Sequence, residues 1–347
     1  MDMEINLQRR DILLTIPREK AELLAFLERH HLHPEDDLTY ATALVNDEDE
    51  IVACGASNGK LLKCFAVNEE LRGCNALGRL VNDLTTYCMQ QGCFNPMVVT
   101  RAHNVPLFEN CGFSCVARTE QVGLLERIPG GAARFAGAFR QSDDAGKTIG
   151  AIVMNANPFT KGHRYLVEQA AAQCDVLHIF VVEEDRSAFP FAHRLKLVEE
   201  GTSDLANVRV HPGGPYIISD ATFPRYFLKE TDDAAVMQTE LDAQVFANAI
   251  APALNITVRF VGTEPNCGLT DQYNRSMQTV LPQHGIRLVE IPRIESGEQA
   301  ISASRVRAML ARGCAPEELD ALLPSVTMDF LCSAEGQEVI ERLRQTK

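Results

Sequence analysis

The chain lacks a paired-cysteine motif, a basic tract and any apolar run long enough to cross a membrane. None of its 11 cysteines form a C-x-x-C pair, which argues against a disulfide framework or a structural zinc site and favours a reducing compartment. A formal net charge of -14 argues against a nucleic-acid partner, because clustered lysine and arginine bind phosphate backbones. The start, Met1 to Glu4, is acidic and has no apolar core, so we expect no signal peptide. These absences predict a cytoplasmic protein without a membrane segment.

Three histidines, His30, His31 and His33, lie close together in the sequence and invite a metal-site interpretation. Adjacent helical residues do not share a face, however, and no acidic or cysteine partner is spaced to complete the set. We therefore expect no metal ligands among them.

The length of 347 residues is large for one hydrophobic core and predicts two domains. After Ile128, the sequence Pro129-Gly130-Gly131 is followed by small residues and then a polar stretch ending at Lys147, which is the composition of a linker. We therefore expect a first domain at residues 1–130, a linker at 131–147 and a second domain at 148–347 that ends in a helical cap.

Apolar runs alternate with helical patterns after this linker, as in a parallel α/β domain. The predicted strands are Thr148–Met154, Val176–Val182, Val208–His211, Ile256–Gly262 and Arg287–Ile291. The carboxyl ends of parallel strands meet in one crevice, where ligands bind. Thr160 and Gly262 are therefore expected to share a site, although they are distant in sequence.

The segment Asn157-Pro158-Phe159-Thr160-Lys161-Gly162-His163 lies between the first of these strands and an amphipathic helix. A turn that feeds a helix start presents backbone N–H groups and the positive end of the helix dipole, which favour phosphate oxygens. His163 stands where it could donate to a phosphate during its displacement. The alternative is a simple helix-capping turn with a partly exposed histidine.

A second segment, Ile301-Ser302-Ala303-Ser304-Arg305-Val306-Arg307, also opens a predicted helix and offers hydroxyls and a guanidinium to phosphates. Thr160 to His163 matches the T/H-x-G-H turn, and Ile301 to Arg307 the I-S-x-S/T-x-I/V-R motif, of the nucleotidylyltransferase superfamily, which the chain thus resembles. The resemblance implies a doubly wound parallel sheet. It also implies attack of a nucleophile on the α-phosphate of a nucleoside triphosphate, with loss of pyrophosphate.

The same resemblance implies that His163 and Arg307 are catalytic and supply positively charged donors. The residues that it implies for nucleotide binding are Asn157, Phe159, Thr160, Gly162, His163, Gly262, Ser302, Ser304 and Arg307. ATP would be the substrate, with Mg2+ bridging its phosphate oxygens. Lys161 and Arg194 are further candidates, but each also fits an ordinary surface charge.

The first domain has a different pattern: a strand from Leu61 to Val67, a turn opening a helix, a strand from Met97, and a stretch ending in Gly112-Phe113. This order resembles the acetyltransferase fold that binds coenzyme A, an α+β domain in which such a turn holds the pyrophosphate. By that resemblance the acyl-pantetheine-binding residues are Arg72, Gly73, Asn75 and Leu77. Asn75 stands where that family most often has glycine. A retained scaffold without a ligand is the alternative.

An acetyltransferase-like domain joined to a nucleotidylyltransferase domain resembles the citrate lyase ligase family, as do Tyr216 to Pro224, Val261 to Pro265 and Tyr273 to Met277. The resemblance implies a thioester-forming ligase. Acetate and ATP would give acetyl adenylate and pyrophosphate, and the acetyl group would pass to the prosthetic-group thiol of the acyl carrier subunit of citrate lyase, releasing AMP. Two alternatives remain open: an adenylyltransferase that makes a dinucleotide or a coenzyme A precursor, and a noncatalytic sensor of acyl-pantetheine and nucleotide.

Overall fold

The computed structural model describes residues 7–71, 73–183, 187–218, 223–229, 233–263, 268–297 and 299–345, without the side chains of 268–272. The chain divides into two compact units. One comprises Met1–Gly131 and Phe223–Leu241, and the other Ala132–Thr222 and Asp242–Lys347. The segment Phe223–Leu241 thus packs with the first unit, although it lies within the stretch predicted for the second domain. In the described ranges, no helix is long and apolar enough to cross a membrane.

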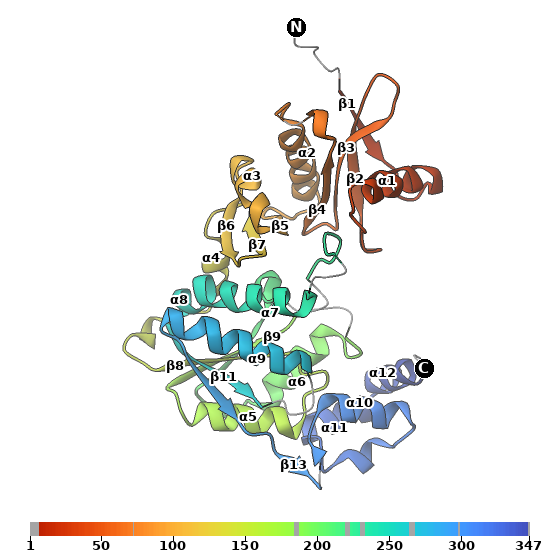
Figure 1. The fold of residues 1–347 in the computed structure, drawn as a ribbon. Helices are drawn as coiled ribbons and strands as arrows, with labels where there is room; N and C mark the ends of the chain where they lie inside the picture. Colours follow the sequence, from red (N-terminus) through yellow and green to blue (C-terminus); the bar gives the residue numbers. More distant parts are fainter. Residues whose placement is uncertain are drawn as a thin grey trace. The chain divides into compact units, whose positions relative to one another are not determined.

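The first unit is an α+β structure built on two antiparallel sheets, ordered β1-β2-β3-β4 and β5-β7-β6. Its elements before Gly131 are β1 (Gln8–Ile12), α1 (Pro17–Arg29), β2 (Tyr40–Val45), β3 (Ile51–Ser57), β4 (Leu62–Val67), η1 (Glu69–Leu71), α2 (Ala76–Gln90), β5 (Met97–Arg101), η2 (Ala102–Asn104), α3 (Val105–Asn110), β6 (Ser114–Arg118) and β7 (Val122–Glu126). Helices α1 and α2 lie on opposite sides of the four-stranded sheet (Figure 1). In α2, the helical spacing of Leu80, Leu84 and Cys88 buries one face against that sheet.

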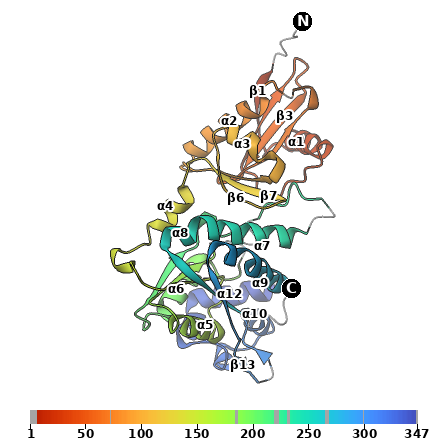
Figure 2. The same cartoon turned by 60° about the vertical axis from the view of Figure 1, so that its left-hand side comes forward.

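The second unit contains a five-stranded parallel sheet in the order β10-β9-β8-β11-β12. The sheet strands and the helices between them are β8 (Ile149–Met154), α5 (Lys161–Ala171), β9 (Val176–Val181), α6 (Phe191–Gly201), β10 (Val208–Pro212), η4 (Gly214–Tyr216), α7 (Ala234–Val245), η5 (Phe246–Ile250), α8 (Ala251–Leu254), β11 (Ile256–Gly262), α9 (Gly268–Val280), η6 (Leu281–His284) and β12 (Arg287–Ile291). The residues of α7 up to Leu241 belong to the first unit. Helices α5 and α6 cover one face, while α8 and α9 cover the other (Figures 1 and 2). The predicted fold class is confirmed: an α+β first part and a doubly wound parallel sheet.

The stretch predicted as a linker carries α4 (Gly131–Gly137) and η3 (Ser142–Asp144). After the sheet follow β13 (Glu295–Ser296), β14 (Gln299–Ala300), α10 (Ala303–Ala311), η7 (Pro316–Leu319), α11 (Ser325–Cys332) and α12 (Ala334–Gln345). These last helices share an apolar cluster in which Ile301, Val306 and Leu310 pack with residues of η7 to α12. The cluster fixes the start of α10, where the second candidate motif lies.

Candidate functional site

Thr160 and His163 hold each other at the start of α5. Thr160 is the N-cap residue, and its Oγ1 accepts the backbone N–H of His163 at 3.3 Å. The Nδ1 atom of His163 accepts the backbone N–H of Thr160 at 3.1 Å and lies 2.9 Å from Thr160 Oγ1. The imidazole thus takes the part that a glutamate plays in an ordinary capping box. Because Nδ1 is an acceptor, the neutral ring carries its proton on Nε2.

The His163 ring is uncharged at neutral pH. Burial, and secondarily the positive charge of Arg293, lowers the pKa of His163 to about 4. In the protein without nucleotide the ring therefore donates a hydrogen bond and no charge. The prediction that His163 becomes a cationic donor beside bound phosphates stays a prediction. Phe159 stacks against the imidazole. It is fully buried, and its ring centre lies 5.9 Å from that of His163, with an angle of 16° between the ring planes.

The two candidate phosphate motifs meet at Gly162. A Cβ atom at this position would lie 2.9 Å from the backbone carbonyl oxygen of Ile301 and 3.5 Å from Thr160 Oγ1. Only a residue without a side chain permits so close an approach without displacement of the backbone. The starts of α5 and α10 are therefore direct neighbours.

Ser302 caps α10, and its Oγ accepts the backbone N–H of Arg305 at 3.2 Å. The side chain of Arg305 folds back over the β13–β14 hairpin. There Nη1 donates to the carbonyl oxygens of Ser296 and Gln299, at 3.2 and 3.4 Å. The hairpin thus fixes the position of this guanidinium beside the helix start.

Arg307 ties α10 to the turn that precedes α5. Its Nη1 donates to the backbone carbonyl of Asn157, and its Nη2 donates to Ser304 Oγ at 3.4 Å. The side-chain Oδ1 of Asn157 accepts the backbone N–H of Phe189 at 3.0 Å. Asn157 and Arg307 therefore brace the turn.

A cavity of about 780 Å³ opens where these helix starts meet the strand ends. Strands β8 and β11 are neighbours followed by helices on opposite faces, which is where ligands bind in such sheets. The predicted nucleotide-binding residues that line the cavity are Thr160, Gly162, His163, Gly262, Ser302 and Ser304. Asn157, Phe159 and Arg307 are not among the described residues that line the cavity. These three support the residues that line it.

Three arginines missed in the sequence analysis, Arg259, Arg293 and Arg305, also line the cavity. Glu295 is the one carboxylate among its described lining residues, so the cavity is positive although the chain carries a net charge of -14. Arg293 comes two residues after the end of β12, a position that the strand-end rule could have found. Arg259 interrupts an otherwise apolar strand, and a charged residue in such a strand could have indicated a functional position.

The two further candidates have structural contacts. Arg194 in α6 is fully buried, and its Nη1 donates to the carbonyl oxygens of Val182 and Asn155 at 2.8 Å each. The interpretation of Arg194 as a surface charge is therefore wrong. Lys161 Nζ donates to the backbone carbonyl of Asp320. Neither side chain is among the described residues that line the cavity.

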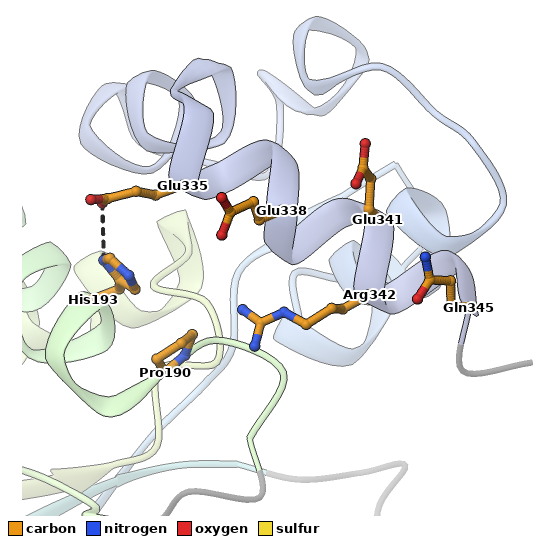
Figure 3. A pocket seen from close by; sticks show the side chains of 7 residues that line it. All are labelled: Pro190, His193, Glu335, Glu338, Glu341, Arg342 and Gln345. Atoms are coloured by element: carbon orange, nitrogen blue, oxygen red, sulfur yellow. Dashed lines mark ion pairs between the residues drawn. The ribbon is translucent and has the colours of Figure 1, made fainter.

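A second groove, of about 580 Å³, lies between α6 and α12 (Figure 3). Glu335, Glu338 and Glu341 line it, and His193 Nδ1 lies 3.7 Å from Glu335 Oε2. Three carboxylates along one helix repel a polyphosphate. This groove is therefore not a candidate nucleotide site.

In the first unit, the turn before α2 has the backbone that glycine favours. Gly73 has a φ of 89°, and Asn75, the N-cap residue of α2, has a φ of 55°. Asparagine enters this left-handed region more readily than most residues, so Asn75 can replace glycine here. Both residues are exposed, Leu77 is half-buried, and Arg72 lies outside the described residues.

Tyr226 of the segment 223–229 contacts the two strands at the junction of the sheets of this unit. It is buried, and its hydroxyl donates to the Val99 carbonyl of β5 at 3.4 Å. Burial raises the pKa of Tyr226, while Cys64 of β4 acts in both directions, since its charge raises this pKa and its backbone hydrogen bond lowers it. Beside it, Arg101 Nη2 donates to the Phe227 carbonyl at 3.0 Å. Cutting the chain at the predicted linker would therefore expose aromatic side chains that the first unit covers.

Buried neutral histidines should make the protein sensitive to acid. Mainly through burial, the pKa values of His163 and His178 fall to about 4 and that of His211 to about 3. An unfolded histidine titrates near pH ~6.5, so below this pH the unfolded state binds more protons and stability falls. We expect the free energy of unfolding, measured with urea, to drop by roughly 1.5 kcal/mol per histidine between pH 6.5 and 5.

The matched variant is His211→Gln, because His178 Nδ1 and His211 Nε2 share a hydrogen bond of 2.8 Å that glutamine can replace. This variant should lose less unfolding free energy between pH 6.5 and 5 than the unchanged protein, by the amount expected for one histidine. A slope equal to that of the unchanged protein would contradict the assignment of a neutral, buried His211.

Comparison with known proteins places the chain in a family. Residues 149–331 match the family model of the citrate lyase ligase C-terminal domain. A citrate (pro-3S)-lyase ligase of Escherichia coli (strain K12) is 40% identical over 337 residues, covering 94% of this chain and 93% of that protein. One from Klebsiella pneumoniae is 41% identical over 334 residues, with coverages of 95% and 97%.

Among solved structures, Thermotoga maritima TmcAL bound with alpha-thio ATP is similar at 15% identity and a TM-score of 0.36, over 56% of this chain and 57% of that one. The sequence relatives span both units and nearly their own full lengths. The chain therefore belongs to the citrate lyase ligase family.

Proposed function

We propose that the protein acetylates the prosthetic-group thiol of the acyl carrier subunit of citrate lyase in two steps, through acetyl adenylate. In the first step, a carboxylate oxygen of acetate attacks the α-phosphorus of ATP. The bond from this phosphorus to the bridging oxygen breaks, and pyrophosphate leaves. In the second step, the thiol sulfur attacks the acetyl carbonyl carbon, the bond to the AMP oxygen breaks, and the thiol proton passes to solvent.

The observation that carries this proposal is the convergence of two helix starts on one positive cavity, with His163 fixed between them. Thr160 occupies Nδ1, so Nε2–H is the donor that the ring can offer to an α-phosphate oxygen. A donor held in place before the reaction stabilises charge as it builds in the transition state. Acetate is already ionised at neutral pH, so adenylation needs no general base.

Arg293 and Arg305 are suited to the β- and γ-phosphates, because both line the cavity beside the helix starts. Arg307 would act through Asn157, by holding the turn before α5. Mg2+ fits this donor set: it commonly binds through substrate phosphates with one or two carboxylates, and Glu295 is present. Bound there, it would neutralise phosphate charge.

The test of this function is exchange of labelled pyrophosphate into ATP. We expect exchange that depends on acetate, and AMP release when the deacetylated carrier protein is added. Exchange that needs a phosphorylated nucleophile in place of acetate would favour an adenylyltransferase. Absence of exchange with any acid would contradict an adenylating ligase.

We also propose that the turn before α2 holds the phosphates of the carrier's prosthetic group, since its exposed residues precede a helix N-terminus. Asn75→Asp adds a negative charge in a position and conformation that aspartate tolerates. We expect it to slow carrier acetylation about three- to tenfold, the scale of one charge near a helix start, while acetate-dependent exchange stays unchanged.

Asn75→Gly is the control, because glycine adopts the same backbone without charge. It should acetylate the carrier at the rate of the unchanged protein. Full-length chains are needed for this comparison, since Tyr226 and Phe227 pack with the first unit. Equal carrier rates for both variants would assign this unit a scaffolding role.

A further inference from the structure

Arg259 is a buried charge with unused donors. It lies in the middle of β11, is 2% exposed and lines the cavity. Its Nε and Nη1 atoms have no hydrogen-bond partner among the described residues. Leaving such donors unsatisfied costs free energy, so a buried guanidinium of this kind calls for an acceptor that is bound only part of the time.

The surroundings of Arg259 hold it in place and leave these donors open. Phe246 lies under the guanidinium, 4.6 Å from its carbon to the ring centre. The nearby acid, Asp242, already has donors of its own: the Tyr273 hydroxyl donates to Oδ2, and the Ile218 N–H donates to Oδ1 at 2.7 Å. Asp242 is thus satisfied by neutral donors and does not occupy Arg259 Nε or Nη1.

We propose that Arg259 binds the carboxylate of the acid substrate and that the walls beside it limit the acid to a short chain. This inference rests on the proposed function, since it concerns the same cavity. The ligand class is a small monocarboxylate, and acetate is the ligand used in the test.

A monocarboxylate fits this place better than a phosphate for two reasons. A triphosphate needs several cations, and Arg293 after β12 and Arg305 in the first turn of α10 also line the cavity. Arg259 carries a single positive charge, and the buried Asp242 in its vicinity already offsets part of it, so a ligand with one negative charge suits this place better than one with several. On the Arg259 face of the sheet, Val153 of β8 and Val261 of β11 give the cavity an apolar wall, which suits a methyl group.

Val261 is placed to limit the length of the carbon chain of the bound acid. It lies two residues after Arg259 on β11, so both side chains project from the same face of the strand. A longer acid held by Arg259 would therefore press its carbon chain against this wall. One methylene changes binding in a hydrophobic pocket by about 10- to 200-fold.

The experiment is acetate-dependent pyrophosphate exchange with Arg259→Met, which keeps a long side chain and removes the donors. We expect the KM for acetate to rise about 10- to 100-fold, the scale of losing hydrogen bonds to a charged group, with the KM for ATP changed less than about threefold. Arg305→Met is the mirror control and should raise the KM for ATP more than that for acetate. Thermal stabilisation by ATP reports that each variant is folded.

Val261→Ala gives an independent reading if Arg259→Met does not fold. It should raise the ratio of kcat/KM for propionate to kcat/KM for acetate by about tenfold or more. Unchanged acetate and propionate constants in both folded variants, with an active unchanged protein, would overturn the role of Arg259 and leave the proposed function standing. Absence of acetate-dependent exchange in the unchanged protein would instead reject the function itself.

Discussion

Replacing His163 with alanine is expected to lower the rate of acetyl adenylate formation roughly 100- to 1,000-fold, the usual loss for one preorganised donor. The reason is local. The Nδ1 atom is held by the Thr160 N–H, so the ring cannot turn freely and Nε2–H is the remaining donor of a side chain that lines the cavity. Alanine is a good helix former at this first turn, so we expect the variant to remain folded. Labelled pyrophosphate exchange at saturating acetate measures the effect.

Two substitutions of His163, by glutamine and by asparagine, distinguish the roles of the two ring nitrogens. His163→Gln places an amide N–H near the position of Nε2, whereas His163→Asn can replace only the acceptor at Nδ1. If donation from Nε2 is what matters, glutamine should retain about tenfold more activity than asparagine or alanine. Asparagine equal to the unchanged protein would show that His163 serves only to cap α5.

The charge state adds a second check on the same residue. Because the pKa of His163 is lowered to about 4, its neutral form prevails from pH 6 to 8. Exchange rates in this range should therefore not rise as the solution is acidified. A rise with an apparent pKa near 6.5 would indicate that a cationic imidazole is the active form.

The sheet could be predicted from sequence because its strands are apolar runs between turn signals. The predicted strand Ile256–Gly262 has the same bounds in the structure, and Thr148–Met154 differs by one residue. The convergence of Thr160, His163 and Ser302 followed from strand-end geometry and motif resemblance. Local pattern was sufficient wherever burial and chain direction decided the structure.

Other features depended on contacts that no local pattern contains. The neutral state of His163 follows from burial and from Arg293, which is distant in sequence. The packing of Phe223–Leu241 with the first unit rests on Tyr226 and Phe227, aromatic residues in a stretch without helical or strand periodicity. The braces formed by Arg194 and Arg307 are made to backbone carbonyls, and sequence gives no sign of which carbonyls lie near.

The second large effect is expected at Gly162, which carries no chemistry of its own. In Gly162→Ala the new Cβ would lie 2.9 Å from the Ile301 carbonyl oxygen, a backbone atom that cannot turn aside. The starts of α5 and α10 must then move apart, and a shift of about 1 Å in a catalytic array can cost roughly 100-fold in rate. We expect kcat/KM for ATP in the exchange assay to fall about 10- to 100-fold.

The control is Gly137→Ala at the end of α4, where a Cβ meets no atom within 4 Å in the described structure. Both substitutions add one methyl group to a helical glycine, and alanine is the better helix former by about 1 kcal/mol. Helix propensity alone would therefore leave both variants as stable as the unchanged protein or more so. If Gly162→Ala keeps full activity, the two helix starts do not need their close contact, and the nucleotide must be positioned by side chains such as Arg305 and His163 alone.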